Sequence, residues 1–211
     1  MSEDLRQNPD ALLSSIQREE AKLTRGRLKV FLGMCPGVGK TYAMLEAAHR
    51  ELKSGRDVVV GYVETHQRKE TDFLVAGLPQ IPRLQLEYRG VEWTELNLDA
   101  VLDRRPQVAL VDELAHSNAP GSRHPKRWQD VQELLGAGID VFTTLNVQHV
   151  ESRADTVHQI VGIEIRETVP DSVLDDPVME LVDLPPSELI QRLREGKVYV
   201  SDRAAAAVQN F

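Results

Sequence analysis

Short apolar runs rich in β-branched residues alternate with helix-like segments along most of the chain. The apolar runs predict strands at 28–32, 57–63, 84–88, 108–111 and 139–145. The segments between them predict helices at 40–53, 68–76, 93–103 and 126–135. Apolar strands separated by helices are typical of βαβ units, whose parallel strands are buried on both faces. The pattern therefore predicts an α/β fold, a mostly parallel sheet with flanking helices.

The chain divides into three regions of different composition. Residues 1–25 form a polar tail with one amphipathic helix, residues 26–165 form the alternating core, and residues 166–211 form a C-terminal extension rich in Pro and Asp. The helix of the tail is predicted over 10–23, after the start signal Asn8-Pro9-Asp10. The extension predicts one more strand at 178–182 and a helix at 187–195. Its alanine-rich end is expected to be helical and to lead into further domains.

The stretch GMCPGVGKTY, at 33–42, breaks the chain between the first strand and the first helix. Gly37 and Gly39 permit backbone conformations that a side chain blocks, so successive N–H groups can point into one concavity at a helix N-terminus. We expect Lys40 to reach the β- and γ-phosphates of ATP, and the hydroxyl of Thr41 to coordinate Mg²⁺. The nucleotide-binding residues expected from this P-loop are Pro36, Gly37, Val38, Gly39, Lys40, Thr41 and Tyr42.

The loop departs from the strict pattern G-x-x-x-x-G-K-[ST], because Met34 stands where the first glycine belongs and Gly33 comes one place early. Two other interpretations stay open. A loop rich in Gly and Pro before a lysine can be a plain turn and helix start. A dinucleotide fold would use the first two glycines of GVGKTY and Glu64 after the next strand, but Tyr42 occupies the place of its third glycine. The flanking strand and helix favour the P-loop.

A second motif, VALVDE, ends a buried strand in two carboxylates. In a P-loop nucleotide hydrolase, Asp112 would hold Mg²⁺ through its water shell, and Glu113 would orient or deprotonate the attacking water. A solvated turn is the alternative for an Asp-Glu pair at the end of a strand. The strand IDVFTTLN is expected to end at the same edge of the sheet, where Thr143, Thr144 and Asn146 would sense a γ-phosphate or cap a helix.

The stretch HSNAPGSRHPKRW is a basic loop in an acidic protein. Arg123, Lys126 or Arg127 is a candidate for the positive charge that an arginine finger brings to a γ-phosphate, in this chain or a neighbouring one. Arg123 and Glu113 are the expected catalytic residues, although a solvated charge run explains the basic residues equally well. The six histidines lack the paired spacing of a zinc site. Cys35 is interpreted as a small loop residue rather than a redox group.

Composition narrows the classes of function. The chain has 211 residues, of which 41% are hydrophobic and 27% charged, as in ordinary globular proteins. Its net charge of -8 argues against nucleic acid as a partner, because phosphate-backbone binders usually carry a basic excess. A single cysteine excludes an intrachain disulfide and favours the cytoplasm. No apolar run approaches the roughly 18 residues of a membrane span, and the polar start does not resemble a signal peptide.

From about residue 22 to its end, the chain resembles the N-terminal cytoplasmic domain of the KdpD family, bacterial sensor histidine kinases that respond to potassium limitation and osmotic stress. The resemblance rests on the phrases PGVGKTYAML, QRKET, LEYRG, DRRPQVALVDELAHSNAPGSRHPKRWQDV, GIDVFTTLNVQHVES, ETVPDSVLD, ELVDLPP and QRLREGKVYV. Carried over residue by residue, the ATP loop of the family falls on Gly37, Gly39, Lys40 and Thr41, and its acidic strand end on Asp112 and Glu113.

This resemblance implies an ATP-binding regulatory domain on a homodimeric protein of the bacterial inner membrane, with the present residues in the cytoplasm. It also implies a universal-stress-like domain, transmembrane helices, and a histidine kinase module that passes phosphate to a response regulator controlling a potassium pump. None of these lies in the 211 residues, so the chain is expected to be a fragment. Three functions stay open: regulatory binding of ATP and Mg²⁺, hydrolysis as a P-loop ATPase, and a scaffold with a vestigial loop whose helix at 10–23 and HPKRW stretch dock other domains.

Overall fold

The computed structural model describes residues 24–66, 68–161 and 165–194. The helix expected over 10–23 and the alanine-rich end lie outside these residues. Among the helices that are described, none combines the length and the apolar character needed to cross a bilayer.

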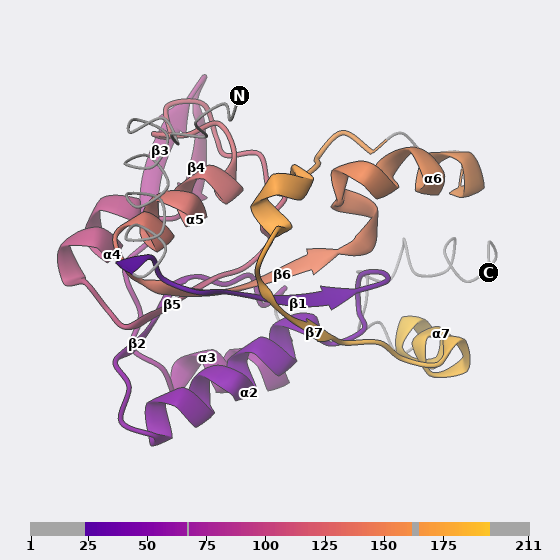
Figure 1. Cartoon of the computed structure of the whole chain (residues 1–211), viewed down its shortest axis with the longest axis horizontal. Coiled ribbons are helices and arrows are strands. Elements are labelled where there is room, and N and C mark those ends of the chain that lie inside the picture. The colour runs from indigo at the N-terminus through magenta and orange to yellow at the C-terminus, as the bar shows by residue number, and fades with distance from the viewer. Residues whose placement is uncertain (1–23, 67, 162–164, 195–211) are drawn as a thin grey trace, which may run out of the picture.

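Five parallel strands form the central sheet (Figure 1). In their order across the sheet they are β2 (Val58–Tyr62), β5 (Val108–Val111), β6 (Asp140–Asn146), β1 (Leu28–Gly33) and β7 (Val178–Leu181). Every neighbouring pair runs parallel. The strands β2 and β5 are buried at every residue, as expected of apolar runs between two layers of helices. The predicted α/β fold with a mostly parallel sheet is confirmed, and the C-terminal extension contributes β7 to it.

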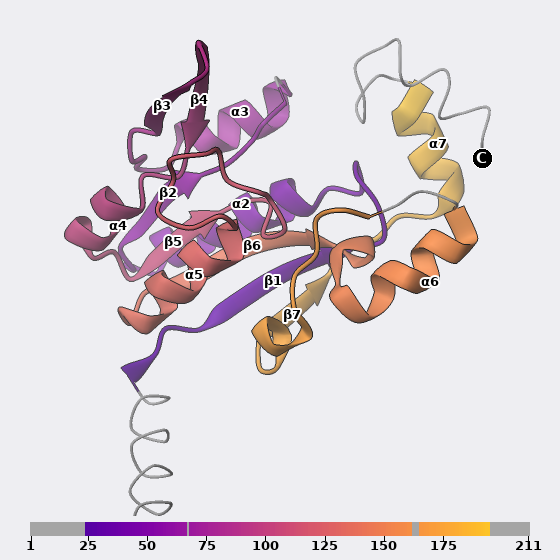
Figure 2. The same ribbon diagram turned by 90° about the horizontal axis from the view of Figure 1, so that it is seen from above.

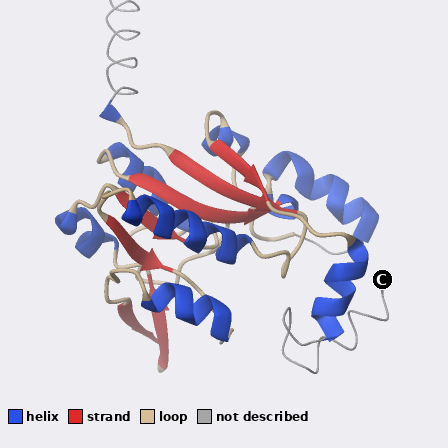
Figure 3. Cartoon of the chain, turned by 90° about the horizontal axis from the view of Figure 1, so that it is seen from below, coloured by secondary structure: helices blue, strands red, loops and turns tan. Residues whose placement is uncertain are grey.

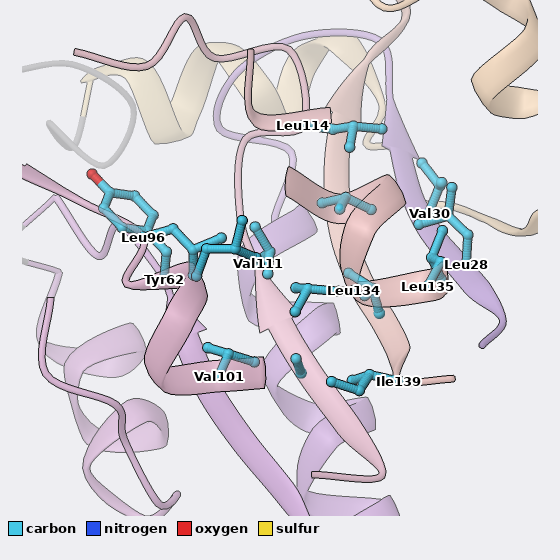
Figure 4. Packing of buried hydrophobic residues seen from close by; sticks show 14 of the residues in the cluster. Leu28, Val30, Tyr62, Leu96, Val101, Val111, Leu114, Leu134, Leu135 and Ile139 are labelled. Atoms are coloured by element: carbon cyan, nitrogen blue, oxygen red, sulfur yellow. The ribbon is translucent and has the colours of Figure 1, made fainter. Parts of the chain in front are cut away.

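Helices cover both faces of this sheet (Figure 1 and Figure 3). On one face lie α2 (Lys40–Lys53) and α3 (Lys69–Ala76), and on the other lie α4 (Leu98–Arg104) and α5 (Arg127–Gly136). Alternate strand residues therefore enter two separate cores. In the core beneath α2, Phe31 and Phe142 meet edge to face with their ring centroids 6.0 Å apart. The core beneath α4 and α5 is formed by buried apolar side chains (Figure 4), which include Leu28, Val30, Val101, Val111, Leu134 and Ile139.

Two further helices lie beyond the carboxyl ends of the strands, α6 (Glu151–Val161) and α7 (Pro186–Arg194) (Figure 1 and Figure 2). A 3₁₀ turn, η1 (Val147–His149), leads from β6 into α6, and a second, η2 (Asp171–Leu174), precedes β7. The helix α7 agrees with the prediction at 187–195. The hydrophobic pattern does not predict α6, because most of its described side chains are exposed and a core-facing stripe is weak.

The strand predicted at 84–88 exists but does not join the parallel sheet. It is β3 (Leu84–Tyr88), which pairs antiparallel with β4 (Val91–Glu95) in a separate two-stranded hairpin. The two residues between them, Arg89 and Gly90, have φ values of 53° and 75°. Two consecutive residues with positive φ form the tight turn whose twist matches that of a hairpin. Gly90 is the sequence signal for this turn.

The helix predicted at 93–103 is wrong in its first part. Residues 93–95 belong to β4, and α4 begins only at Leu98. Asn97 fixes this start, because its side chain accepts a hydrogen bond from the Ala100 amide at 3.2 Å and so satisfies a donor of the first helical turn. The strand and the helix follow each other so closely that one amphipathic pattern spans both.

Gly33, the last residue of β1, lies where the chain folds back over the end of its own strand. A Cβ at this position would come within 2.6 Å of Val38 Cγ2 and within 2.9 Å of both Lys40 Cδ and Val182 O. The last of these contacts is a backbone carbonyl, which cannot rotate away. Packing at the end of β1 therefore requires glycine here, one residue before the position in the strict loop pattern.

Substitution of Gly33 by Ala should lower the free energy of unfolding by about 1–3 kcal/mol, because the added methyl group overpacks this turn. The measurement is urea unfolding followed by circular dichroism. Gly136→Ala is the matched control. Among the described residues, no heavy atom lies within 4 Å of the Cβ that it would add at the end of α5. That variant should unfold like the wild type or at up to about 1 kcal/mol higher free energy. Equal stabilities of the two variants would contradict the packing requirement.

Candidate functional site

The glycine loop, residues 34–39, connects β1 to α2 at the carboxyl edge of the sheet. Gly37 and Gly39 have φ values of 89° and 102°, in the left-handed region that favours glycine. Gly39 is the N-cap of α2, and in this fully described helix neither a side-chain cap nor an acidic residue occupies the first turn. The first amides of α2 are therefore available to an anion, which the helix dipole also favours.

Lys40, the first residue of α2, is only 9% exposed. Its Nζ donates a hydrogen bond to the carbonyl of Cys35 at 3.0 Å, so the ammonium group is held against the glycine loop. Burial lowers the pKa of Lys40, and the charge of Asp112 opposes this shift. A buried cation beside uncapped helix amides is a second feature that fits an anion. Burial also raises the pKa of the Cys35 thiol, which favours its neutral form.

Asp112 links three elements at the end of β5 and is fully buried. Its Oδ2 accepts a hydrogen bond from Thr41 Oγ1 of α2 at 3.1 Å. Its Oδ1 accepts one from Thr144 Oγ1 of β6 and one from the Glu113 amide, the latter at 3.1 Å. Because β6 lies between β1 and β5, the hydroxyl of Thr144 reaches the carboxylate from the neighbouring strand. The structure thus brings together three residues that the sequence assigns to one edge of the sheet.

Glu113 follows Asp112 in the left-handed conformation, with φ of 58°. Its amide donates to Asp112 Oδ1 and to Thr144 Oγ1 at 3.1 and 3.2 Å, and these bonds hold the unusual conformation. Its side chain is 42% exposed, with an oxygen 3.8 Å from His66 Nε2. Burial and then the charge of Asp112 raise the pKa of Glu113. A carboxyl group whose pKa is raised above its ordinary value accepts a proton from water more readily.

The side chains of Thr41 and Asp112 form a pair of hard oxygen donors beside the glycine loop. Magnesium takes one or two such ligands from a protein and completes its octahedron with water and phosphate oxygens. The pair therefore fits Mg²⁺ that arrives with a phosphate ligand. Within the described residues, no group of three or more His, Cys, Asp or Glu side chains is arranged to hold a metal by itself.

Two polar atoms of β6 are buried and lack a hydrogen-bond partner within the described residues, Thr143 Oγ1 and Asn146 Oδ1. Asn146 is paired with Gly33 in the register of β6 and β1, and it lies two residues beyond Thr144, on the same face. A buried oxygen without a partner is costly unless water or a ligand binds it. Asn146 therefore fits a ligand at this edge, whereas Thr143 lies on the opposite face of the strand.

Arg127, the first residue of α5, is completely buried. It donates to Glu95 Oε2 at 2.7 Å and to the carbonyl of Asp112 at 3.3 Å. Its guanidinium carbon also lies 3.9 Å from the centroid of the Tyr62 ring. This arginine reaches only the rim of the site, where Nη1 lies 3.9 Å from Glu113 Oε2. Arg127 thereby links Glu95 of the hairpin strand β4 to the backbone carbonyl of Asp112 after β5.

Glu95 was not predicted as part of this region, and its neighbourhood explains why a buried carboxylate is tolerated. Besides Arg127, it accepts hydrogen bonds from the Ala119 amide at 2.8 Å and from His116 at 3.1 Å. Burial alone would raise the pKa of Glu95, but His116, the Ala119 amide and Arg127 together lower it below its ordinary value. The carboxylate is thus ionised and fully partnered.

The structure does not bring Arg123 or Lys126 to the glycine loop. Arg123 pairs with Asp99 of α4 and, at 2.6 Å, with Glu133 of α5. Lys126 donates from Nζ to Ser117 Oγ at 2.7 Å and lies at the start of α5. Within this chain, both basic side chains take part in contacts around α5, so a role as an arginine finger would require a rearrangement or a neighbouring molecule.

Sequence reasoning missed two basic residues near the glycine loop. Arg192 of α7 donates from Nη1 to the carbonyl of Gly37 at 3.4 Å, across 155 positions of sequence. Arg68, the N-cap residue of α3, is close enough to Lys40 and Asp112 for their charges to interact. No local pattern marks either residue, because only the packing of α3 and α7 brings them to this edge.

Comparisons with known proteins relate the chain to one family. The protein-family model "KdpD: Osmosensitive K+ channel His kinase sensor domain" matches residues 24–211. The chain is 57% identical over 212 residues to the Sensor protein KdpD of Escherichia coli (strain K12), covering 100% of this chain and 23% of that protein. It is 50% identical over 207 residues to the Sensor protein KdpD of Clostridium acetobutylicum, covering 98% and 23%. The chain thus spans less than a quarter of the length of these curated relatives.

Among solved structures, the signal recognition particle receptor FtsY from Elizabethkingia anophelis, in complex with GDP, is similar over 81% of this chain and 49% of its own. The identity is 17% and the TM-score is 0.30. This likeness is too loose to support an inference about the site.

Replacement of Arg127 by Met should lower the free energy of unfolding by about 3–5 kcal/mol, because it leaves the Glu95 carboxylate buried without its cation. The double variant Glu95→Gln/Arg127→Met should lose less than Arg127→Met alone, since the uncharged amide tolerates burial better. Urea unfolding at pH 7 measures both. A double variant less stable than the single one would contradict this account of the pair.

The ion pair of Glu95 and Arg127 also predicts how the stability of the protein depends on pH. Because the pKa of Glu95 is lowered in the folded protein, its stabilising effect is fully present above the ordinary carboxyl pKa of about 4.3 and is lost as pH falls through the lower folded value. The stability difference between the wild type and Arg127→Met should therefore shrink below about pH 4. A constant difference down to pH 3 would mean that packing, not charge, accounts for the effect.

Proposed function

The chain belongs to the KdpD family of sensor proteins, and from this premise we propose that it is the ATP-binding regulatory domain of a two-component sensor histidine kinase. The observation that carries the proposal is the hydrogen bond between Thr41 Oγ1 and Asp112 Oδ2, at 3.1 Å. It joins the start of the helix after the glycine loop to the acidic end of another strand. That is the relation expected of a P-loop that binds ATP together with Mg²⁺.

In the proposed complex, the amides of the glycine loop and the start of α2 bind the phosphates, with Pro36, Val38 and Tyr42 completing the loop. Lys40 adds a positive charge, and its hydrogen bond to the carbonyl of Cys35 already holds it against the loop. Thr41 and Asp112 hold Mg²⁺, which would neutralise charge on the β- and γ-phosphates. The uncapped start of α2 and the unpartnered oxygen of Asn146 within the described residues support a ligand at this edge.

The role of ATP in the proposal is regulatory. Since the chain spans 23% of the two relatives compared above, the kinase activity would reside in the rest of the protein. Binding of ATP shifts the balance between kinase and phosphatase states only if the two states bind it with different affinities. This proposal includes a response regulator that receives phosphate and the control of potassium uptake under potassium limitation or osmotic stress. It also includes a homodimeric assembly and a cytoplasmic location below the inner membrane.

A second candidate function is hydrolysis of ATP, and the environment of Glu113 favours it. This carboxyl group has a raised pKa and is partly exposed next to the proposed Mg²⁺ ligand Asp112. A group with these properties can take a proton from an attacking water. The third possibility, a scaffold with a vestigial loop, requires that ATP does not bind at all.

We expect ATP with Mg²⁺ to raise the melting temperature of the wild-type chain, and Lys40→Ala to abolish the increase. At a hundred times its dissociation constant, a ligand adds about 2.7 kcal/mol to the stability of the folded state. Differential scanning fluorimetry with and without ATP and Mg²⁺ measures the change.

Lys53→Ala is the matched control, because Lys53 is an exposed lysine at the other end of the same helix. It should retain the full increase. If ATP leaves the melting temperature of the wild type unchanged at millimolar concentration, the scaffold function is favoured and the proposal fails.

Substitution of Glu113 by Gln separates binding from turnover. For a regulatory domain, we expect the variant to keep the stabilisation by ATP, and both proteins to release phosphate slowly in a coupled assay. If the wild type instead hydrolyses ATP and Glu113→Gln reduces the rate by about 10²-fold or more, the domain is an enzyme in its own right. Glu92→Gln, an exposed glutamate on the hairpin, controls for the loss of one negative charge.

A further inference from the structure

The helix α7, the last that the structure describes, packs directly on the glycine loop. Leu189 and Val38 are both buried, at 6% and 2% exposed, and form a small apolar cluster with Val182 and Leu184 as partly buried neighbours. The Val182 amide also donates to the carbonyl of Leu32 at 2.8 Å. The segment from β7 to α7 therefore follows the end of β1 and then contacts the loop (Figure 2).

Arg192 lies one helical turn beyond Leu189, on the side of α7 that faces the loop. Its Nη1 lies 3.4 Å from the carbonyl of Gly37 and 3.6 Å from where a Cβ on Gly39 would be. Its Nη2 lies 3.4 Å from Glu188 Oε1. Both contacts are at the long limit for hydrogen bonds, so the guanidinium is near the loop without a short bond to either of these partners.

Three basic residues from three different helices converge here. Lys40 begins α2, Arg68 directly precedes α3 and Arg192 lies in α7. Burial lowers the pKa of Arg68, Asp112 opposes the shift and Arg192 adds to it, while Arg68 in turn lowers the pKa of Lys40. Like charges that approach one another repel, and an anion between them relieves the repulsion.

We propose that Arg192 is a phosphate-binding residue of the nucleotide site, supplied by the C-terminal extension. The inference rests on the proposed function and deepens it. On binding of the nucleotide, the guanidinium leaves the carbonyl of Gly37 and donates to a phosphate oxygen. This exchange replaces a long bond to a neutral carbonyl by a shorter, charge-assisted one, for which the planar fork of arginine is well suited.

The position of Arg192 on α7 links occupancy of the site to the docking of that helix. Phosphate binding holds α7 on the loop through Arg192, in addition to the contact between Leu189 and Val38. Conversely, any displacement of α7 removes one phosphate ligand and weakens the affinity for the nucleotide, because coupling between two sites is reciprocal.

The test measures the affinity of the 211-residue chain for a fluorescent ATP analogue with Mg²⁺, and competition by unlabelled tripolyphosphate. Arg192→Ala should weaken both ligands by about tenfold, as expected for loss of one charge-assisted bond. Arg192→Lys should recover part of the affinity, because it restores the charge without the fork. Arg104→Ala, which removes an arginine paired with Asp57 near the amino end of β2, should bind like the wild type.

The outcomes distinguish this inference from the proposed function. Unchanged affinity of Arg192→Ala, with binding lost in Lys40→Ala, would refute the role of Arg192 and leave ATP binding intact. A weakened affinity for ATP but not for tripolyphosphate would refute a phosphate contact. Absence of binding by the wild type would refute both proposals.

Hydrogen exchange of the amides in 186–194 supplies an independent readout. ATP with Mg²⁺ should slow their exchange in the wild type and much less in Arg192→Ala. Equal protection in both proteins would show that α7 docks without help from Arg192.

Discussion

The buried carboxylate of Asp112 is the constraint on which the rest of the site depends. A charge at the end of β5 with no exposure to solvent is tolerated only where donors surround it. Thr41, Thr144 and the Glu113 amide supply those donors from α2, β6 and the following residue. A shift of α2 relative to the acidic strand end would therefore remove the Thr41 donor from this buried carboxylate, so the hydrogen bond holds the two motifs in a fixed relation.

Around this negative centre, the chain arranges positive charge in two layers with different roles. Arg127 forms an ion pair with Glu95 and lies over the ring of Tyr62, so its role is structural. Lys40, Arg68 and Arg192 lie on the side of the glycine loop. Among the described acidic groups, Asp112 acts most strongly on the pKa of Lys40 and of Arg68, and it raises both. The first layer stabilises the apo protein, and the second fits an anionic ligand.

The succession of core strands and helices along the chain could be predicted from sequence, because each core strand is a short and mostly apolar run followed by a helical segment. The meeting of Thr41 and Asp112 follows from their places after parallel strands of one sheet, although their roles stay predictions. The strand β3 was predicted, but its hairpin partner β4 was not, because its short exposed run lies directly before the true helix α4. Contacts such as those of Arg192 with Gly37 depend on tertiary packing over 155 positions, which no local pattern encodes.

The edge position of β7 has a consequence for how the molecule is divided. Its backbone bonds make β1 an interior strand, flanked on both sides, although β7 comes from a region whose composition differs from that of the core. Without that neighbour, the strand that carries the glycine loop would present unpaired amides and carbonyls to other molecules, a common origin of edge-to-edge aggregation. Shortened versions of this protein should accordingly keep the chain at least through α7, even though the change in composition near residue 165 invites a cut there.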